Sequence, residues 1–331
     1  MKQFFSLTEL EITDIERLLA LAKRIQKEPV NDWLKGKVMG LLFMNSSLRT
    51  LASFQSGVSQ MGGSTFVVQP GAGSWNLETR DGVVMDGDKQ EHIREAVPVL
   101  AGYCDVLGIR KFAEGRDMEE DLRDGLMRTA AELTGGSFVN MESAADHPCQ
   151  ALADWKTLDD LEIPRDGKLV LSWAYHPKPL TYAVPRAALT MALLRGMNVT
   201  IMNPPGFDLP PSLLAEASAI GGTRLSTTHN RREGMDGAHV MYCKSWSAEE
   251  AYGKQTRHDE LVGGLRDWCV DEPWFEPALP EAKFMHCLPV RRNVKVSDAV
   301  LDGRRSVVQQ EANNRLHVQK AVVAQILGVA R

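Results

Sequence analysis

Residues 37–50 read KVMGLLFMNSSLRT, an apolar run followed directly by a polar turn. Residues 37–44 are apolar enough to form a buried strand, and a helical pattern over Thr50–Gln60 follows the turn. A strand that leads through a short polar turn into a helix is the unit from which parallel α/β sheets are built. This stretch therefore predicts an open parallel sheet with helices on its faces.

The same alternation of apolar run and amphipathic segment continues along the chain. Seven further apolar runs are predicted to be buried strands: Ser64–Gln69, Val106–Ile109, Ser137–Met141, Lys168–Tyr175, Asn198–Asn203, His239–Cys243 and Lys283–Leu288. Helical patterns lie between most of them, for example over Val184–Leu194, and one long helix is predicted from Glu311 to Val329. The predicted fold class is α/β, with parallel sheets covered on both faces.

The length of the chain, 331 residues, predicts two domains, because one hydrophobic core rarely serves so many residues. The best domain boundary lies near residues 145–165. Asp146-His147-Pro148 begins a predicted helix there, and residues 163–167, which include a proline and a glycine, separate it from the next strand. We therefore expect domains over residues 1–150 and 151–310, followed by a helical segment over residues 311–331.

Composition and charge disfavour several classes of protein. A net charge of -5 argues against a general nucleic-acid binder, which needs a basic face. The five cysteines form no Cys-x-x-Cys pair, which favours free, mostly buried thiols and disfavours a zinc site. No apolar run of roughly 18 residues and no secretory signal is found, so we expect no membrane span.

The turn after the first strand is a candidate anion site. A helix start presents free backbone N–H groups, and Ser47, Arg49 and Thr50 add donors suited to phosphate oxygens. Plain N-capping of the helix by Ser46 or Ser47 explains the same hydroxyls without any ligand. No G-x-x-x-x-G-K-[ST] segment occurs, so a P-loop nucleotide site is disfavoured.

Other polar residues also follow predicted strands, at the edge where parallel sheets bind ligands. Arg110 follows Val106–Ile109, and His147 and Gln150 lie at a predicted helix start. Arg291 and Arg292 come shortly after the last strand, where either a bound anion or a solvated basic turn would explain them.

Three motifs together resemble the signature of the aspartate/ornithine carbamoyltransferase family: Ser47-Leu48-Arg49-Thr50, His147-Pro148-Cys149-Gln150 and His286-Cys287-Leu288-Pro289. The resemblance covers essentially the full length. It implies two doubly wound α/β domains joined by helices, with the last helix crossing back onto the first domain. It also implies homotrimers with sites shared between subunits, and no cofactor or metal.

The family transfers a carbamoyl group from carbamoyl phosphate to an amine, which requires positive charge at the phosphate and donors at the carbonyl oxygen. By resemblance, the catalytic residues are Arg110, His147 and Cys287. The carbamoyl phosphate residues implied in the same way are Ser47, Leu48, Arg49, Thr50, Trp75, Arg110, His147, Gln150, Cys287, Leu288 and Arg315.

This sequence departs from the motifs of ornithine carbamoyltransferases, and these departures narrow the choice of amine substrate. The Asp-x-x-Ser-Met-Gly motif that holds a free α-amine is absent, and Lys244 stands in its place, where it suits an α-carboxylate. Segments such as Gly73-Ser74-Trp75 resemble the branch that uses N-acetylornithine or N-succinylornithine, with N-acetylornithine favoured and arginine biosynthesis as the implied pathway. The acceptor residues implied by this resemblance are Trp75, Gln90, Glu142, Lys244, Leu288 and Arg291.

Two departures keep alternatives open. Gln90 matches neither the Glu that accompanies acetyl acceptors nor the Pro that accompanies succinyl acceptors, so N-succinylornithine stays an alternative. Leu51 replaces a second arginine at the helix start, which leaves open an inactive paralogue acting as a binding or regulatory subunit. A nucleotide-dependent dehydrogenase is disfavoured, because no G-x-G-x-x-G follows a strand. Lys295 is expected to be exposed.

Overall fold

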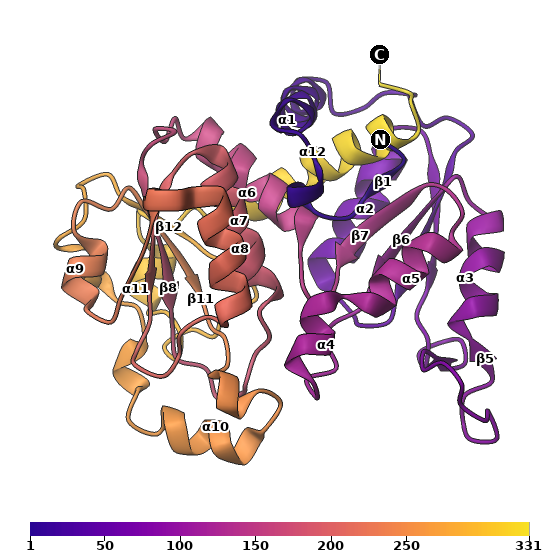
Figure 1. Ribbon diagram of the computed structural model, residues 1–331. Coiled ribbons are helices and arrows are strands. Elements are labelled where there is room, and N and C mark those ends of the chain that lie inside the picture. The colour runs from indigo at the N-terminus through magenta and orange to yellow at the C-terminus, as the bar shows by residue number, and fades with distance from the viewer. Residues whose placement is uncertain (331) are drawn as a thin grey trace. The chain divides into compact units, whose positions relative to one another are not determined.

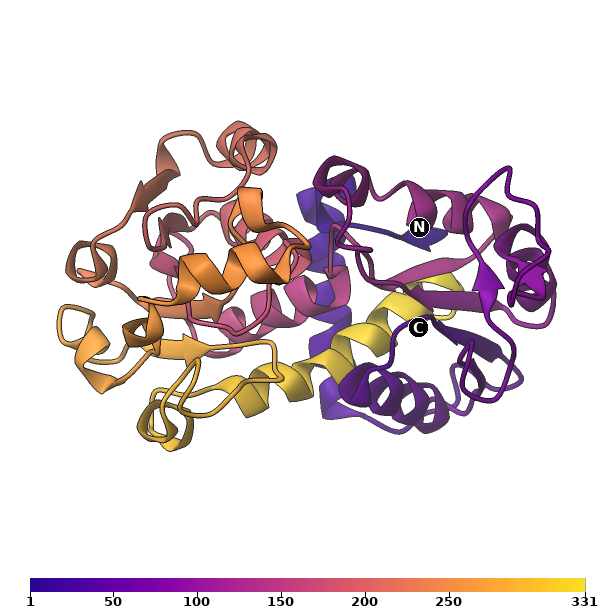
Figure 2. The same ribbon diagram turned by 90° about the horizontal axis from the view of Figure 1, so that it is seen from below.

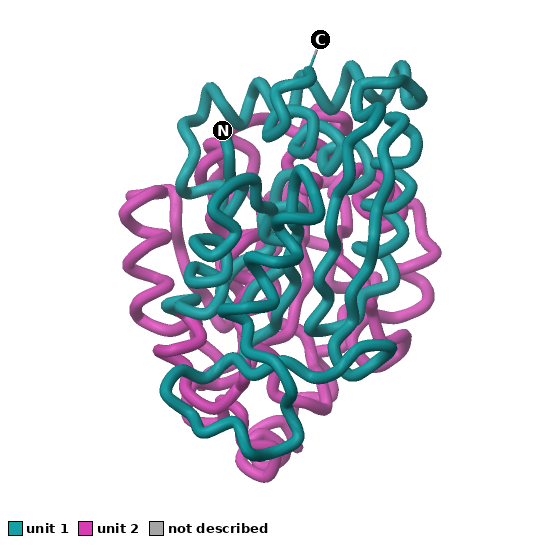
Figure 3. Tube along the Cα trace, turned by 90° about the vertical axis from the view of Figure 1, so that its right-hand side faces the viewer, with its two compact units in different colours: residues 1–113, 123–152, 315–331 teal, residues 114–122, 153–314 magenta. Residues whose placement is uncertain are grey.

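The computed structural model describes residues 1–330, which fold into two compact units (Figure 3). Unit 1 comprises residues 1–113, 123–152 and the chain from residue 315 onward, and unit 2 comprises residues 114–122 and 153–314. Three helices contain residues of both units: α4 (Met118–Arg123), α6 (Pro148–Asp160) and α12 (Val308–Ile326). Within the described residues, no helix is long and apolar enough to cross a membrane.

Unit 1 is built on a five-stranded parallel sheet in the order β1-β7-β6-β2-β3. Its strands are β1 (Gln3–Phe4), β2 (Val38–Phe43), β3 (Ser64–Val68), β6 (Val106–Arg110) and β7 (Phe138–Glu142). Its other helices are α1 (Ile12–Lys27), α2 (Leu48–Gln60), α3 (Ile93–Gly102) and α5 (Gly125–Leu133). A small parallel pair, β4 (Leu77–Glu78) with β5 (Glu91–His92), brackets a long loop.

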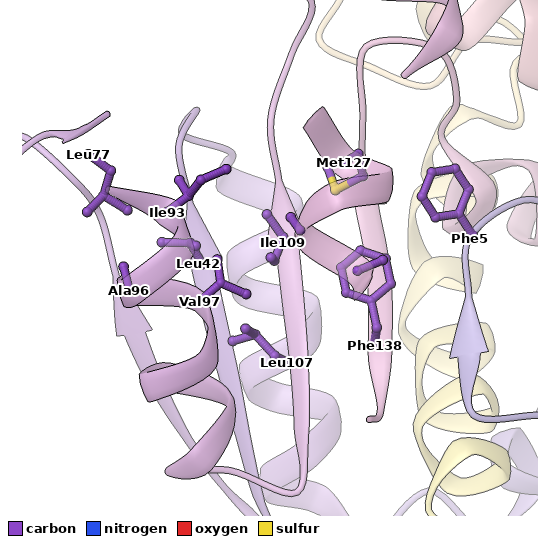
Figure 4. Packing of buried hydrophobic residues seen from close by; sticks show 12 residues of the cluster. Phe5, Leu42, Leu77, Ile93, Ala96, Val97, Leu107, Ile109, Met127 and Phe138 are labelled. Atoms are coloured by element: carbon purple, nitrogen blue, oxygen red, sulfur yellow. The ribbon is translucent and has the colours of Figure 1, made fainter. Parts of the chain in front are cut away.

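The core of unit 1 lies between its sheet and helices α3 and α5 (Figure 4). Leu42, Leu107 and Ile109 project from the strands toward Ile93 and its neighbours on α3. Each such side chain is at most 3% exposed, and burial of one large apolar side chain contributes about 1.5–3 kcal/mol. This packing holds the strand ends of the sheet, where the polar side chains are found, in fixed positions.

Helix α2 packs against the C-terminal part of α12, which runs alongside the other elements of unit 1 (Figures 1 and 2). Gly57 of α2 makes this approach close, because a Cβ there would lie 3.2 Å from the side chain of Lys320. Lys320 in turn donates to the carbonyl of Pro29 at 2.7 Å and to the side chain of Gln60. The last helix, from Arg315 onward, is therefore part of the fold of unit 1.

Unit 2 repeats the architecture with a parallel sheet in the order β10-β9-β8-β11-β12. Its strands are β8 (Lys168–Trp173), β9 (Asn198–Met202), β10 (Leu225–Thr228), β11 (Val240–Lys244) and β12 (Lys283–Met285). Its helices are α7 (Ala183–Arg195), α8 (Pro211–Gly221), α9 (Arg231–Met235), α10 (Gln255–Val262) and α11 (Asp298–Asp302). Helix α7 ends at Gly196, whose φ of 102° supplies the left-handed C-terminal cap.

The predicted α/β class and all eight predicted strands are confirmed, with deviations in the bounds of some elements. Strand β8 ends at Trp173 and β12 at Met285, two and three residues earlier than predicted, and the residues after Met285 turn out of the sheet. Helix α12 begins at Val308 and ends at Ile326, three residues earlier at each end than predicted. The two-residue strands β1, β4 and β5 were not predicted, nor was β10, whose sequence, Leu-Ser-Thr-Thr, has one apolar residue and lies at a sheet edge.

Candidate functional site

The turn after β2 has the predicted helix-start geometry. Ser47 caps α2, and its Oγ accepts from the backbone N–H of Thr50 at 3.3 Å, so the capping role weighed from the sequence is present. Thr50 is fully buried, whereas Leu48 is 82% exposed and Arg49 is half-buried. The helix start therefore presents its backbone and Arg49 outward while the hydroxyl of Thr50 faces the interior.

Two arginines from distant parts of the sequence meet at the hydroxyl of Thr50. Arg315 donates from Nη2 to Thr50 Oγ1 at 2.8 Å, and Arg110 donates from Nη1 to the same oxygen at 3.4 Å. Arg110 and Arg315 are only 6% and 3% exposed. Burial lowers the pKa of Arg315, and the nearby Arg110 and Arg49 act in the same direction. Buried positive charges that lie this close together repel one another, and a bound anion would stabilise them.

His147 and Gln150 belong to the same part of unit 1, as expected. His147 directly precedes α6, whose first residue is Pro148, and it is 3% exposed. Gln150 lies in the first turn of α6 and is 1% exposed. The carboxylate of Glu142 lies 3.2 Å from His147 Nε2 and 2.5 Å from Arg110 Nη1. Glu142 therefore lies with Arg110 and His147, which the family resemblance assigns to carbamoyl phosphate, although the same resemblance assigns Glu142 to the acceptor.

Trp75 lies just before β4 and Gln90 lies at the end of the loop between β4 and β5, and both are exposed. Trp75 donates from its indole Nε1 to Glu91 Oε2 at 2.7 Å. Glu78 anchors the loop by accepting from Arg80 and, at 3.1 Å, from Lys89, the neighbour of Gln90. Within the described residues, neither Trp75 nor Gln90 bonds to the residues around Arg110, so this chain alone does not bring them to that group.

Lys244 and Cys287 are brought together at the strand ends of unit 2. Lys244 ends β11, and its Nζ lies 3.5 Å from Cys287 Sγ. The backbone after β12 turns sharply, because Leu288 has a φ of 55° and its N–H donates to His286 Nδ1 at 2.8 Å. The predicted strand was too long here because these residues form that turn. The five cysteines are free thiols, and Cys149, Cys243 and Cys287 are buried.

Lys295 contradicts the expectation that it is exposed. It is 2% exposed, and its Nζ lies 3.3 Å from His286 Nε2. Burial, reinforced by Lys244, lowers the pKa of Lys295 to about 7. The expectation was wrong because a lysine after a basic turn is typically solvated, and nothing local in the sequence indicates that the turn folds inward.

Two further polar residues of unit 2 were not singled out from the sequence. Burial, together with Lys295, Arg291 and Lys244, lowers the pKa of His176 to about 4. Glu311 is fully buried and accepts from the backbone N–H of His286 at 2.9 Å, and its burial raises its pKa. Both lie outside the three motifs, so only the tertiary structure relates them to the Cys287 turn.

The two arginines after β12 have different surroundings. Arg292 is exposed and forms ion pairs with Asp298 at 2.7 Å and Asp302 at 2.6 Å, which makes it a structural part of the turn. Arg291 is exposed, and its positive charge lies close enough to His176 to lower the pKa of that imidazole. Among the described residues, no group of three or more His, Cys, Asp or Glu side chains is placed to hold a metal ion.

Comparison with known proteins relates this geometry to one family. Residues 2–160 match the carbamoyl-phosphate-binding domain of aspartate/ornithine carbamoyltransferases, and residues 183–326 match the Asp/Orn-binding domain. The N-acetylornithine carbamoyltransferase of Xanthomonas campestris is 38% identical over 100% of this chain and 99% of its own length. The N-succinylornithine carbamoyltransferase of Bacteroides thetaiotaomicron is 34% identical over 95% of each.

A solved structure extends the likeness to the whole fold. An acetylornithine transcarbamylase complexed with acetylcitrulline superposes with a TM-score of 0.93 at 37% identity, covering 98% of this chain and 99% of that one. The matches span both units and include the strand-end turns described above. The chain belongs to the aspartate/ornithine carbamoyltransferase family.

Proposed function

We propose that this enzyme transfers the carbamoyl group of carbamoyl phosphate to the side-chain amine of N-acetylornithine, giving N-acetylcitrulline and phosphate. The observation that carries the proposal is the convergence of Arg110 and Arg315 on Thr50 at the start of α2. Backbone N–H groups, hydroxyls and guanidinium groups are the donors that phosphate oxygens require. The family's carbamoyl-phosphate-binding domain covers Thr50 and Arg110, and Arg315 lies within the match to the Asp/Orn-binding domain.

The chemistry explains why these residue types occur there. The neutral amine attacks the carbonyl carbon of carbamoyl phosphate, a C–N bond forms, and negative charge develops on the carbonyl oxygen. The C–O bond to phosphate then breaks, and the amine loses a proton. We assign Arg110 and His147 to that oxygen, and Ser47, Leu48, Arg49, Thr50 and Arg315 to the phosphate. A single fixed donor at such an oxygen typically contributes about 2.7–4 kcal/mol to catalysis.

The remaining assignments are extensions of the same proposal. Gln150, Cys287 and Leu288 are assigned to the carbamoyl group, and Lys244, Arg291, Leu288 and Glu142 to the acceptor. Burial lowers the pKa of His176 most, and Lys295, Arg291 and Lys244 lower it further; this group of cations supports an anionic acceptor group, such as an α-carboxylate, near Lys244. We assign residues 1–150 to carbamoyl phosphate binding, residues 151–310 to the acceptor, and residues 311–331 to a helix that completes the first domain.

Trp75 and Gln90 fit the proposal best in an oligomer. Both are exposed, Trp75 just before β4 and Gln90 just before β5, and a residue that serves a neighbouring subunit has to be exposed in the single chain. We therefore propose a homotrimer in which Trp75 and Gln90 serve an adjacent subunit. Light scattering should give three times the chain mass of 36.7 kDa, and a monomer would contradict this assignment. A cytoplasmic role in arginine biosynthesis completes the proposal by analogy with the family.

N-Succinylornithine is the second candidate acceptor, because Gln90 is neutral and leaves room for a further carboxylate. The deciding experiment compares ornithine, N-acetylornithine and N-succinylornithine side by side with carbamoyl phosphate. The proposal expects the highest kcat/KM with N-acetylornithine and little citrulline from ornithine. A higher kcat/KM with N-succinylornithine would make that compound the acceptor in place of N-acetylornithine. Comparable rates with free ornithine would refute an acylated acceptor. No turnover with any of the three would favour the inactive paralogue.

A further inference from the structure

Glu142 occupies the donors that the proposed reaction needs. A single carboxylate oxygen, Oε2, is 2.5 Å from Arg110 Nη1 and 3.2 Å from His147 Nε2. The side chain of Glu142 is 13% exposed, and those of Arg110 and His147 are 7% and 4% exposed. Contacts this short and this protected from water are strong charge-assisted interactions.

The backbone directs Glu142 into this position. Its φ of 140° is one that side-chain-bearing residues rarely adopt, and the β6–β7 register shifts between Ile109 and Arg110, directly opposite. Fully buried Asn140 fixes the bend, because its Oδ1 accepts from the N–H of Glu142 at 3.0 Å. Strained backbone of this kind persists only where the surrounding structure holds it, and it concentrates at functional sites.

The contact also determines which ring nitrogen of His147 carries a proton. A carboxylate can only accept, so His147 Nε2 must carry the proton that it shares with Glu142. While that N–H is donated to Glu142, it is not available to the carbonyl oxygen of a substrate. Arg110 Nη1 is engaged in the same way, so Glu142 occupies one donor atom on each of the two proposed oxyanion-binding side chains.

We propose that the carboxylate of Glu142 is an internal anion that occupies Arg110 and His147 in the substrate-free enzyme and is displaced when carbamoyl phosphate binds. The inference rests on the proposed function for the identity of the displacing ligand. The carboxylate offsets the repulsion among Arg110, Arg315 and Arg49 until the phosphate takes over that role. The enzyme thereby gains a stable empty state and binds its first substrate less tightly than its cations alone would allow.

Titration calorimetry of Glu142→Gln with carbamoyl phosphate, and separately with inorganic phosphate, tests the proposal. Glutamine keeps the shape but cannot compete as an anion, so carbamoyl phosphate should bind about tenfold more tightly than to wild type, which is the difference between a charged and a neutral hydrogen-bond competitor. Glu9→Gln is the matched control, because it removes one carboxylate of unit 1 that pairs with exposed Arg128 instead. It should bind as wild type does.

A positioning role for Glu142 would give the opposite result. If the carboxylate stays in place and only orients Arg110 and His147, Glu142→Gln will bind carbamoyl phosphate as wild type does or more weakly, and the proposal is overturned. Failure of wild type itself to bind carbamoyl phosphate would overturn the proposed function instead. The two failures are therefore distinguishable without any acceptor present.

Thermal unfolding provides a second readout that does not depend on calorimetry. A displaced carboxylate contributes only to the empty enzyme, so Glu142→Gln should melt below wild type without ligand and equal to it in saturating carbamoyl phosphate. A difference that persists in saturating carbamoyl phosphate would overturn the proposal. Glu142→Asp, which keeps the charge but shortens the reach to both donors, should tighten carbamoyl phosphate binding by less than glutamine does.

Discussion

Replacing Thr50 with valine removes one hydroxyl at the point where two buried arginines meet, while the shape of the side chain is kept. The substitution deletes the 2.8 Å bond from Arg315, the 3.0 Å bond from Ser47 Oγ and the 3.4 Å contact from Arg110. A hydrogen bond to a charged group contributes about 1.5–3 kcal/mol and a neutral one about 0.5–1.5 kcal/mol, whereas a contact at 3.4 Å adds little. We therefore expect Thr50→Val to lower the free energy of unfolding by about 2–4 kcal/mol.

Thr190→Val is the matched control for this measurement. Thr190 is also a largely buried helix residue, but its hydroxyl donates only to the neutral carbonyls of Arg186 and Ala187. Its loss should cost about 0.5–1.5 kcal/mol, the range for neutral hydrogen bonds. Urea unfolding of both variants, followed by tryptophan fluorescence, gives the two values under the same conditions.

Kinetics complete the test of Thr50. Freed from the hydroxyl, Arg315 and Arg110 lose their common orientation, so KM for carbamoyl phosphate should rise about tenfold or more in Thr50→Val and stay unchanged in Thr190→Val. Equal losses of stability in the two variants, together with an unchanged KM, would refute the view that Thr50 organises the arginines.

Three other substitutions probe different parts of the chain. Arg49→Ala should remove nearly all turnover through weakened carbamoyl phosphate binding, and an unchanged kcat/KM would exclude the helix start from the site. Gln90→Glu should lower any activity with N-succinylornithine by placing like charges together, and a rise in that activity would show that Gln90 is remote from the acyl group. Because the pKa of Lys295 is lowered from 10.5 to about 7, the unfolded chain binds one more proton than the folded protein between these values. The contribution of Lys295 to the free energy of unfolding therefore rises with pH between about 7 and 10.5, by up to about 1.4 kcal/mol per pH unit. Urea unfolding at several pH values should show this rise in wild type and a smaller one in Lys295→Met. Identical pH profiles of the two proteins would contradict the lowered pKa.

Strand prediction succeeded where a strand has a continuous apolar run, and it missed a polar edge strand. Val38–Phe43 and Val106–Arg110 lie inside a sheet covered by helices, so their apolar runs are continuous and easily recognised. Leu225–Thr228 is an edge strand whose polar residues face water, and its pattern resembles a loop. A pattern of apolar side chains therefore shows which residues are buried. It identifies a strand only when that strand is buried.

The candidate site shows a similar division. The helix start at Ser47 could be predicted, because capping and anion binding depend on residues close in sequence. The contacts of Glu142 with Arg110 depend on a bulge between two strands, and the burial of Lys295 depends on an inward turn. Neither has a local signature, so the family resemblance assigned Glu142 to the acceptor without indicating which partners it has in the empty protein.

The distance along the chain between Thr50 and Arg315 has a consequence for biosynthesis. These residues are 265 positions apart, yet they share one hydrogen bond within unit 1. A ribosome makes the sheet of unit 1 long before it makes Arg315, so the nascent chain carries a helix start without its buried arginine. The pair forms only after the intervening unit has been synthesised. Truncation before residue 315 should therefore leave a first unit that lacks both Arg315 and the α12 surface against which α2 packs.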